Sequence, residues 1–313
     1  MTSSPAQNDL QLLELSDWSA ERVGRVLERS VELRDELERD GRNRPRLAQR
    51  TLAAIFEKPS LRTRSSLEVA MMQLGGHCLS LQPAEVGLNT REPAGDVAAV
   101  LSGMADAIAA RTFLHGTVAD LAAASRVPVI NALSDHAHPL QALADLLTIR
   151  DHFGSVEGRR VVYIGDANNV SRSLAVACGL FGMPFVECGP DGFHSDNETI
   201  ARLKRQVPTL AFERIVDPKQ AVAEADVIYT DTWTSMGQEA EKAERIAAFK
   251  GYCIDDDLLA AAPAEAVVLH CLPAYRGLEI SESVMASPRS LVFPQAHNRL
   301  HTVKAVLCDL LDA

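Results

Sequence analysis

The segment TLAAIFEKPSLRTRSSLEVAMMQLGG, residues 51–76, contains complete signals for a strand, a loop and a helix. Residues 51–56 form an apolar run of strand length, and Pro59 ends it because proline lacks an amide donor and disfavours helical geometry in the preceding residue. Ser60 then stands where a helix N-cap belongs. Apolar side chains follow at helical spacing, at Leu67, Ala70, Met71 and Leu74, before a Gly-Gly pair. The segment predicts an amphipathic helix over residues 60–74.

The first turn of this predicted helix is unusually positive. It contains Arg62 and Arg64 beside the hydroxyls of Ser60 and Thr63. A helix N-terminus already carries partial positive charge, so two arginines there cost stability unless an anion shares the site. Free N–H groups, hydroxyls and guanidinium groups together suit a phosphate or a carboxylate. On this segment alone, a simple Ser60 cap with both arginines in solvent is an equally good interpretation.

Length and composition restrict the possible classes of protein. A chain of 313 residues predicts two domains, and a net charge of −11 argues against general binding to nucleic acid or to an anionic membrane. The N-terminus lacks the features of a secretory signal, and no apolar run reaches the roughly 18 residues that span a bilayer. The six cysteines contain no C-x-x-C pair, which indicates reduced thiols. We expect a cytoplasmic protein.

Strand-like and helix-like segments alternate along both halves of the chain. Strands are expected at 51–56, 77–82, 106–113, 127–133, 159–164, 184–190, 226–231 and 266–274. Helices are expected at 19–39, 60–74, 93–104, 117–125, 138–154, 170–183 and 298–313. This alternation predicts an α/β fold with two doubly wound parallel-sheet domains.

The mid-chain helix divides the chain into two predicted domains. We expect the first domain at residues 1–145 and the second at residues 146–296, with a C-terminal helix at about 297–313 that packs back on the first. The two helices would link the domains. Because ligands of open α/β sheets bind at the carboxyl ends of strands, the active site is expected in the cleft between the domains.

Polar residues follow apolar strands at five places. They are the Ser60–Arg64 turn, Arg111 in DAIAARTF, His138 and Gln141 in HPLQ, Asp231 in DTWTSMG, and Cys271 in HCLP. Each has an ordinary alternative: a helix cap, a structural salt bridge, a capping histidine, a simple turn and a buried thiol. GDANN, residues 165–169, lacks two glycines of a dinucleotide fingerprint, so NAD binding is not expected. We expect no cofactor and no metal.

Taken together and in this order, the motifs resemble the aspartate/ornithine carbamoyltransferase family, and within it the branch that uses ornithine. SLRTR, HPLQ, DTWTSMG, HCLP and the late NRL at residues 298–300 match the family's motifs. The resemblance implies transfer of a carbamoyl group from carbamoyl phosphate to the δ-amine of ornithine, giving citrulline and phosphate. It also implies small-molecule partners, a place in arginine metabolism and a homotrimer.

The resemblance assigns roles residue by residue. For carbamoyl phosphate it implies Ser60, Leu61 through its amide, Arg62, Thr63, Arg111, His138 and Gln141. Cys271, the Leu272 backbone and Arg299 would complete the carbamoyl pocket from the other domain. Among these, Arg111, His138, Cys271 and Arg299 are the expected catalytic residues. The expected ornithine ligands are Asn169, Asp231, Ser235 and the Met236 amide.

Some positions depart from the family's pattern, and other functions stay open. Leu61 replaces a frequent threonine, Ala167 replaces a frequent glycine, and Gln295 and His297 replace two acidic residues beside Arg299. Carbamoyltransferases that use N-acetylornithine or putrescine are the nearest alternatives, and they differ in the second-half loop. More distant alternatives are an aspartate carbamoyltransferase, a nicotinamide-linked dehydrogenase and a non-catalytic binding protein.

Overall fold

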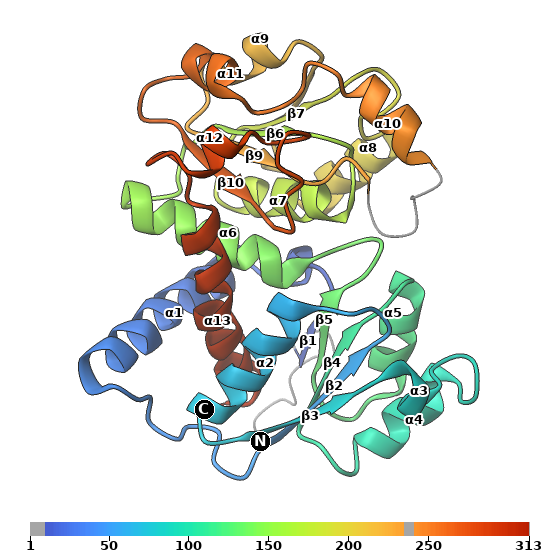
Figure 1. Ribbon diagram of the computed structural model, residues 1–313. Coiled ribbons are helices and arrows are strands. Elements are labelled where there is room, and N and C mark those ends of the chain that lie inside the picture. Colours follow the sequence, from blue (N-terminus) through green and yellow to red (C-terminus); the bar gives the residue numbers. More distant parts are fainter. Residues whose placement is uncertain (1–9, 235–240, 313) are drawn as a thin grey trace. The chain divides into compact units, whose positions relative to one another are not determined.

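The computed structural model describes residues 10–234 and 241–312. The chain divides into two compact units. Unit 1 contains the residues up to Leu147 together with those from His297 on, and unit 2 contains Thr148–Ala296. Each unit is built around one five-stranded sheet, and the ribbon of each is drawn in Figure 1.

The sheet of unit 1 is parallel throughout, with the strand order β1-β5-β4-β2-β3. Its strands are β1 (Gln11–Leu12), β2 (Thr51–Phe56), β3 (His77–Leu81), β4 (Ala107–Arg111) and β5 (Val129–Leu133). The helices of this part are η2 (Leu15–Asp17), α1 (Ala20–Asp40), α2 (Leu61–Gln73), α3 (Pro83–Val86), α4 (Ala94–Leu101) and α5 (His115–Ala124). Helix α4 lies beside α5, and α1 lies beside the C-terminal part of α13 (Figure 1).

The sheet of unit 2 is also parallel, with the order β10-β9-β6-β7-β8. Its strands are β6 (Val161–Ile164), β7 (Phe185–Cys188), β8 (Phe212–Ile215), β9 (Val227–Thr230) and β10 (Val267–His270). Its helices are α7 (Asn169–Leu180), α8 (Asn197–Gln206), α9 (Pro218–Val222), α10 (Lys242–Ala248), α11 (Asp256–Ala261) and α12 (Glu282–Met285). Two further helices, α6 (Pro139–Phe153) and α13 (Val292–Leu310), each begin in one unit and end in the other.

Burial explains why the strands read as continuous apolar runs. Every residue of β6, β7, β9 and β10 is buried, as is each residue of β4. A parallel sheet covered by helices on both faces requires this, because neither face meets water. The predicted α/β fold with two parallel-sheet domains is confirmed.

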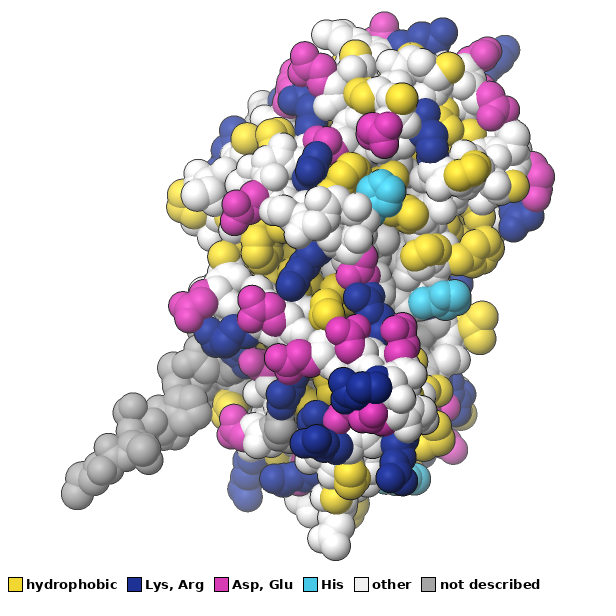
Figure 2. Space-filling view, turned by 90° about the vertical axis from the view of Figure 1, so that its left-hand side faces the viewer, with side chains coloured by type: hydrophobic (Ala, Val, Ile, Leu, Met, Phe, Trp, Pro, Cys, Tyr) yellow, Lys and Arg dark blue, Asp and Glu magenta, His cyan; other side chains and the backbone are white. Residues whose placement is uncertain are grey.

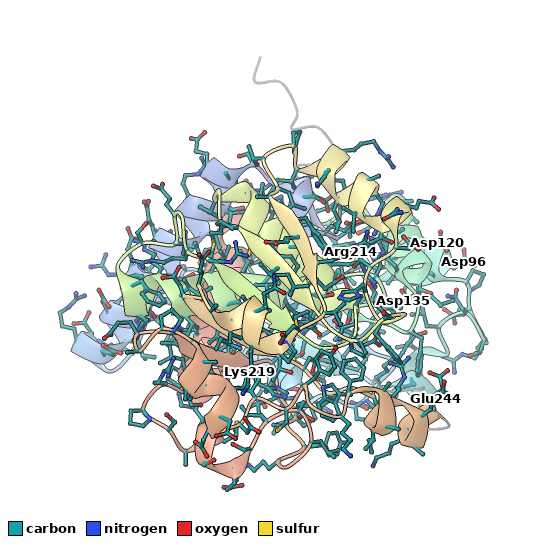
Figure 3. All side chains as sticks on the ribbon, turned by 90° about the horizontal axis from the view of Figure 1, so that it is seen from above. Asp96, Asp120, Asp135, Arg214, Lys219 and Glu244 are labelled. Carbon is teal, nitrogen blue, oxygen red and sulfur yellow. The ribbon has the colours of Figure 1, made fainter. Side chains whose placement is uncertain are left out.

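The sequence interpretation missed several elements. Strand β8 was not predicted, because its Glu213 and Arg214 are exposed at the edge of the sheet (Arg214 is labelled in Figure 3). The two-residue β1 was too short to produce a pattern. Helix α13 begins at Val292 and not at residue 298 as expected. Pro294 obscured this start, although proline is tolerated in the first helical turn, where its missing N–H would have no helical partner.

Charge is distributed over the surface in both signs. Figure 2 shows Lys and Arg side chains interspersed with Asp and Glu over the face in view. Several of the exposed acidic groups are labelled in Figure 3, among them Asp96, Asp120 and Glu244. Among the described residues, no helix is both long enough and apolar enough to cross a membrane.

A buried polar cluster joins α1 to the segment that follows it. Glu36 accepts hydrogen bonds from Arg46 at 2.6 and 3.1 Å and from Asn43 at 3.0 Å. The amine of Lys304 on α13 donates to Asn43 Oδ1 at 2.6 Å, and its burial lowers its pKa to about 8. The bonds from Arg46 lower the pKa of Glu36 to about 2.

Replacing this carboxylate should change stability in a pH-dependent way. We expect Glu36→Gln to lower the free energy of unfolding by about 2 kcal/mol near pH 7, because a charge-assisted bond is lost. The folded-state pKa lies below the ordinary 4.5, so the stabilisation is complete above pH 4.5 and is lost as the pH falls toward 2. Urea unfolding at several pH values should show that the free energies of unfolding of wild type and Glu36→Gln become equal in acid. A difference that does not vary with pH would contradict this.

Candidate active site

The positive turn predicted from the sequence is the N-terminus of α2. It follows β2, and the Ser60 side chain caps it by accepting the Thr63 N–H at 3.3 Å. Leu61 is 76% exposed, so its side chain is not needed for packing, while Thr63 is buried. Arg64 donates to Glu68 one turn later, at 2.8 Å, so we expect the other polar residues of this turn to bind the ligand.

Arg299 is the centre of a buried hydrogen-bond cluster in unit 1. Its Nη1 donates to Gln141 Oε1 at 2.7 Å and to His138 Nε2 at 3.2 Å, and its Nη2 donates to Thr63 Oγ1 at 3.0 Å. Thr63 lies on α2, Gln141 on α6 and His138 directly before α6, and all three are at least 158 positions away in the sequence. The expectation that Arg299 contributes from the second domain was wrong, because α13 returns the chain to unit 1.

The bond from Arg299 determines the protonation state of His138. A guanidinium can only donate, so Nε2 of His138 must be an acceptor and the imidazole must be neutral. The pKa of His138 is lowered well below 6.5, first by burial and then by the charges of Arg299, Arg111 and Arg62. Three guanidinium groups therefore act on one buried imidazole, and the local potential suits an anion.

His138 is expected to stay neutral across the physiological pH range. Its imidazole C–H signals in an NMR titration should show no midpoint near pH 6.5, because burial and the charges of Arg299, Arg111 and Arg62 lower the pKa well below that value. The His138→Gln variant identifies the signals by their loss. A titration midpoint near the ordinary value of 6.5 would show that the arginines do not act on this ring.

Arg111 ends β4, where its backbone pairs with Phe56 and Leu133 of the neighbouring strands. Its side chain is 7% exposed. Nearby, the pKa of Lys58 is lowered by burial and then by the charge of Arg111. The carboxyl edge of the unit 1 sheet thus collects positive charge from β4 and from the β2–α2 loop.

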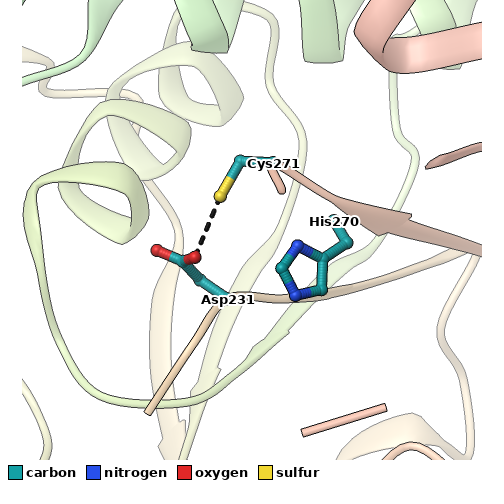
Figure 4. Close-up of side chains that lie close together, drawn as sticks. All are labelled: Asp231, His270 and Cys271. Carbon is teal, nitrogen blue, oxygen red and sulfur yellow. Dashed lines mark hydrogen bonds between the residues drawn. The ribbon is translucent and has the colours of Figure 1, made fainter. Parts of the chain in front are cut away.

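Asp231 follows β9 in unit 2 and is held on both carboxylate oxygens. Asn168 Nδ2 donates to Oδ2 at 3.0 Å. The Cys271 thiol donates to Oδ1 at 3.0 Å, the bond drawn in Figure 4. The Thr232 N–H also donates to Oδ1, at 2.8 Å. The carboxylate is oriented by three donors before any substrate arrives.

Cys271 follows β10 and is placed by its neighbours on the same loop. His270 Nδ1 accepts the Leu272 N–H at 2.8 Å, so the proton of the neutral ring lies on Nε2, which faces Glu279 Oε1 at 3.1 Å. Leu272 has a left-handed backbone, with φ of 59°, and the peptide bond to Pro273 is cis. The backbone after Cys271 therefore makes an abrupt turn that the His270 ring supports.

Asn168 and Arg245 are two residues that the sequence interpretation missed. Asn168 caps α7 in addition to bonding Asp231, whereas the predicted Asn169 is the first residue of that helix. Arg245 on α10 donates to Asp166 at 2.6 Å and to the Trp233 carbonyl at 3.3 Å. It connects the β6–α7 turn to the segment after Asp231. The predicted ligands Ser235 and Met236 lie outside the described residues.

The charge around the unit 2 residues is negative. Burial raises the pKa of Tyr163 well above 10, and the remaining causes are Asp231, Cys271, Asp166 and Glu187, in that order. The Cys271 thiol is neutral while it donates to Asp231, and Arg245 pairs with Asp166 at 2.6 Å. The Asp231 carboxylate is therefore the group that favours a cation such as an ammonium here. The two units therefore carry sites of opposite charge preference.

Three side chains of unit 2 have the atom types and spacing of metal ligands. The ligand atoms of Asp231, His270 and Cys271 all lie within 4.8 Å of one another, and no other such group occurs in residues 10–234 and 241–312. Both ring nitrogens of His270 already have hydrogen-bond partners, and the thiol donates to Asp231. This arrangement forms a hydrogen-bond network without an ion.

Two family models together match most of the chain. The family model "Aspartate/ornithine carbamoyltransferase, carbamoyl-P binding domain" matches residues 11–151, and the "Asp/Orn binding domain" model matches residues 157–310. The chain belongs to the aspartate/ornithine carbamoyltransferase family. The family resemblance predicted from the motifs is confirmed.

Named members of this family match over nearly the whole chain. The ornithine carbamoyltransferase of Acidothermus cellulolyticus is 50% identical over 86% of this chain and 87% of its own length. That of Thermus thermophilus is 48% identical over 96% of both chains. The solved ornithine carbamoyltransferase of Pyrococcus furiosus has a TM-score of 0.91 and 45% identity, with 95% of this chain and 96% of its own covered.

Proposed function

We propose that this chain transfers the carbamoyl group of carbamoyl phosphate to the δ-amine of L-ornithine, giving L-citrulline and phosphate. The observation that carries the proposal is the cluster of Arg299 with His138, Gln141 and Thr63, beside the capped N-terminus of α2. It combines guanidinium, hydroxyl and helix N–H donors in one place. The reaction is also the one named for the relatives.

Carbamoyl phosphate would bind in unit 1. The N–H groups of the α2 turn, the Ser60 and Thr63 hydroxyls and Arg62 would hold the phosphate. Arg111, neutral His138 and Gln141 would bind the carbamoyl and bridging oxygens, with Arg299 orienting the last two residues. Cys271 and the Leu272 backbone are proposed to contribute to the carbamoyl pocket as well.

Ornithine would bind in unit 2. Asp231 would attract the α-ammonium, since its carboxylate is already oriented by Asn168 and Cys271. Asn169, Ser235 and the Met236 amide are proposed to bind the α-carboxylate and α-amine. The δ-amine would then be the group that reaches the carbamoyl carbon.

The chemistry is acyl transfer by positioning and electrostatic stabilisation. The δ-amine attacks the carbamoyl carbon, the C–O bond to phosphate breaks, and the phosphate can take the proton that the amine loses. Preorganised donors such as Arg62, Arg111 and His138 stabilise negative charge on the carbonyl oxygen and the departing phosphate. A lysine-like amine has a pKa of about 10.4, so deprotonating it near pH 8 costs roughly 3 kcal/mol and activity should rise in alkali.

The wider assignments are also proposals. We assign residues 1–145 with about 297–313 to carbamoyl-phosphate binding and residues 146–296 to ornithine binding. The name of the Pyrococcus furiosus relative, an anabolic ornithine carbamoyltransferase, supports a role in arginine biosynthesis. We also propose a homotrimer, which the family resemblance favours, and a cytoplasmic location, which the cysteine pattern favours.

The acceptor can be tested by comparing four amines in separate assays. L-ornithine, N-acetylornithine, putrescine and L-aspartate are offered separately with saturating carbamoyl phosphate, and each carbamoylated product is measured. We expect kcat/KM for ornithine to exceed the others by at least about a hundredfold, because a charged α-amine and α-carboxylate are both recognised. Faster turnover of another amine would contradict ornithine as the acceptor, while the proposed carbamoyl-phosphate site would still stand.

A further inference from the structure

Gln295 is a fully buried amide in the first turn of α13 that bonds two strands of unit 2. Its Oε1 accepts the N–H of His270 at 2.9 Å, and its Nε2 donates to the Tyr229 hydroxyl at 3.1 Å. His270 is the last residue of β10, and Tyr229 lies near the end of β9. One side chain therefore bonds to both of the strands that lead into Cys271 and Asp231.

The local backbone explains why a side chain is needed here. β10 is at the edge of its sheet, and the segment of residues 289–291 pairs along this edge. Val268 donates to the Arg289 carbonyl at 2.8 Å and accepts the Leu291 N–H at 2.9 Å. The chain then turns into α13, so the next N–H on this side, that of His270, has no backbone acceptor and takes the amide oxygen of Gln295 instead.

The hydrogen bond from Gln295 to the Tyr229 hydroxyl begins a second series of contacts, which leads to Asp231. The Tyr229 ring stacks on Tyr163 with centroids 5.8 Å apart, and the Tyr163 hydroxyl donates to the Asp166 carbonyl at 3.2 Å. Asp166 lies two positions before Asn168, which bonds Asp231. The Gln295 amide is thus connected both to the strand that leads into Cys271 and to the residues that hold Asp231. The Cys271 Sγ and Asp231 Oδ1 atoms are 3.0 Å apart.

We infer that Gln295 is a positioning residue for the binding and carbamoylation of ornithine. It sets the ends of β9 and β10 so that the Cys271 thiol meets the Asp231 carboxylate. The inference rests on the proposed function, because it assigns the effect to ornithine and not to carbamoyl phosphate. The bonds involved lie entirely within unit 2.

The test uses the full chain with three variants. Gln295→Asn keeps an amide but shortens it by one methylene, so it cannot hold both partners. Gln295→Glu keeps the length and the acceptor for the His270 N–H. Gln11→Asn is the matched control, because Gln11 is also buried and its Oε1 accepts a strand N–H, that of Val129 at 2.8 Å, in unit 1. Steady-state kinetics are measured for both substrates, together with phosphate binding by calorimetry.

For Gln295→Asn we expect the ornithine KM to rise at least tenfold and kcat to fall, with phosphate affinity within twofold of wild type. Gln295→Glu should remain within about threefold of wild type in kcat/KM for ornithine. Gln11→Asn should change thermal stability without changing the ornithine KM. If the ornithine KM of Gln295→Asn matched that of Gln11→Asn, the inference would be overturned. An equal loss of kcat/KM for both substrates would also overturn it.

A second readout does not depend on turnover. The alkylation of Cys271 by iodoacetamide is followed by mass spectrometry, with Cys253 as the internal reference; both thiols are partly exposed. In Gln295→Asn the Cys271 rate should change at least threefold while the Cys253 rate stays constant, because only Cys271 depends on the strand ends. Unchanged Cys271 reactivity would contradict the inference. Failure of the wild-type chain to form citrulline would instead reject the proposed function.

Discussion

Arg299→Met should lower kcat/KM for carbamoyl phosphate by about a thousandfold or more. The substitution removes bonds to His138, Gln141 and Thr63 together, at 3.2, 2.7 and 3.0 Å. Burial is the first cause of the lowered pKa of His138, and the charge of Arg299 comes next, so the variant would remove the orientation of the imidazole and one of the charges that keep it neutral. Loss of a single preorganised donor already costs about 100- to 1,000-fold in related chemistry.

Two further variants separate geometry from charge. Arg299→Lys keeps the positive charge but loses the planar fork, and we expect about a hundredfold loss from it. Arg276→Met removes a half-exposed arginine that bonds Glu282 at 2.7 Å in unit 2, and its kinetics should be unchanged. A loss below about tenfold in Arg299→Met, measured with initial rates at saturating ornithine, would refute the role of this cluster.

Asp231→Asn should raise the ornithine KM by about a hundredfold while leaving phosphate binding intact. The amide has the same shape, but it removes the negative charge that would attract the α-ammonium. It also places an NH₂ group where Asn168 or Cys271 now donates, so at least one of these 3.0 Å bonds must be lost. A charge-assisted bond in a buried site accounts for an effect of this size.

The control for this variant is Asp226→Asn. Asp226 precedes β9 by one residue and pairs with Arg159 at 3.1 Å, away from the Cys271 loop. Its ornithine KM should remain within about twofold of wild type. If Asp231→Asn raised the carbamoyl-phosphate and ornithine KM values equally, Asp231 would have a general structural role and not the proposed one.

Local sequence signals predicted much of the fold and part of the site. Ser60 was identified as a helix cap from Pro59 before it and the apolar repeat after it, and the structure confirms the cap. The strands were found because parallel strands covered on both faces contain almost only apolar residues. Edge strand β8 has exposed charged residues and does not follow this rule.

The partners within the site could not be predicted, because they are distant in sequence. Arg299 is 236 positions from Thr63, and Arg245 is 79 positions from Asp166. Nothing in the neighbourhood of Gln295 indicates that its amide oxygen accepts a strand N–H 25 positions earlier. Asn168 was overlooked in favour of Asn169, since only the three-dimensional structure shows which of the two caps α7 and bonds Asp231.

The central claim is carbamoyl transfer to ornithine, and product stoichiometry tests it most directly. Purified protein is mixed with carbamoyl phosphate, with and without L-ornithine, and citrulline and phosphate are both measured over time. We predict equal amounts of citrulline and phosphate with ornithine, and no phosphate above the spontaneous rate without it. Phosphate release at the same rate with and without ornithine, or no citrulline from the folded protein, would contradict the account.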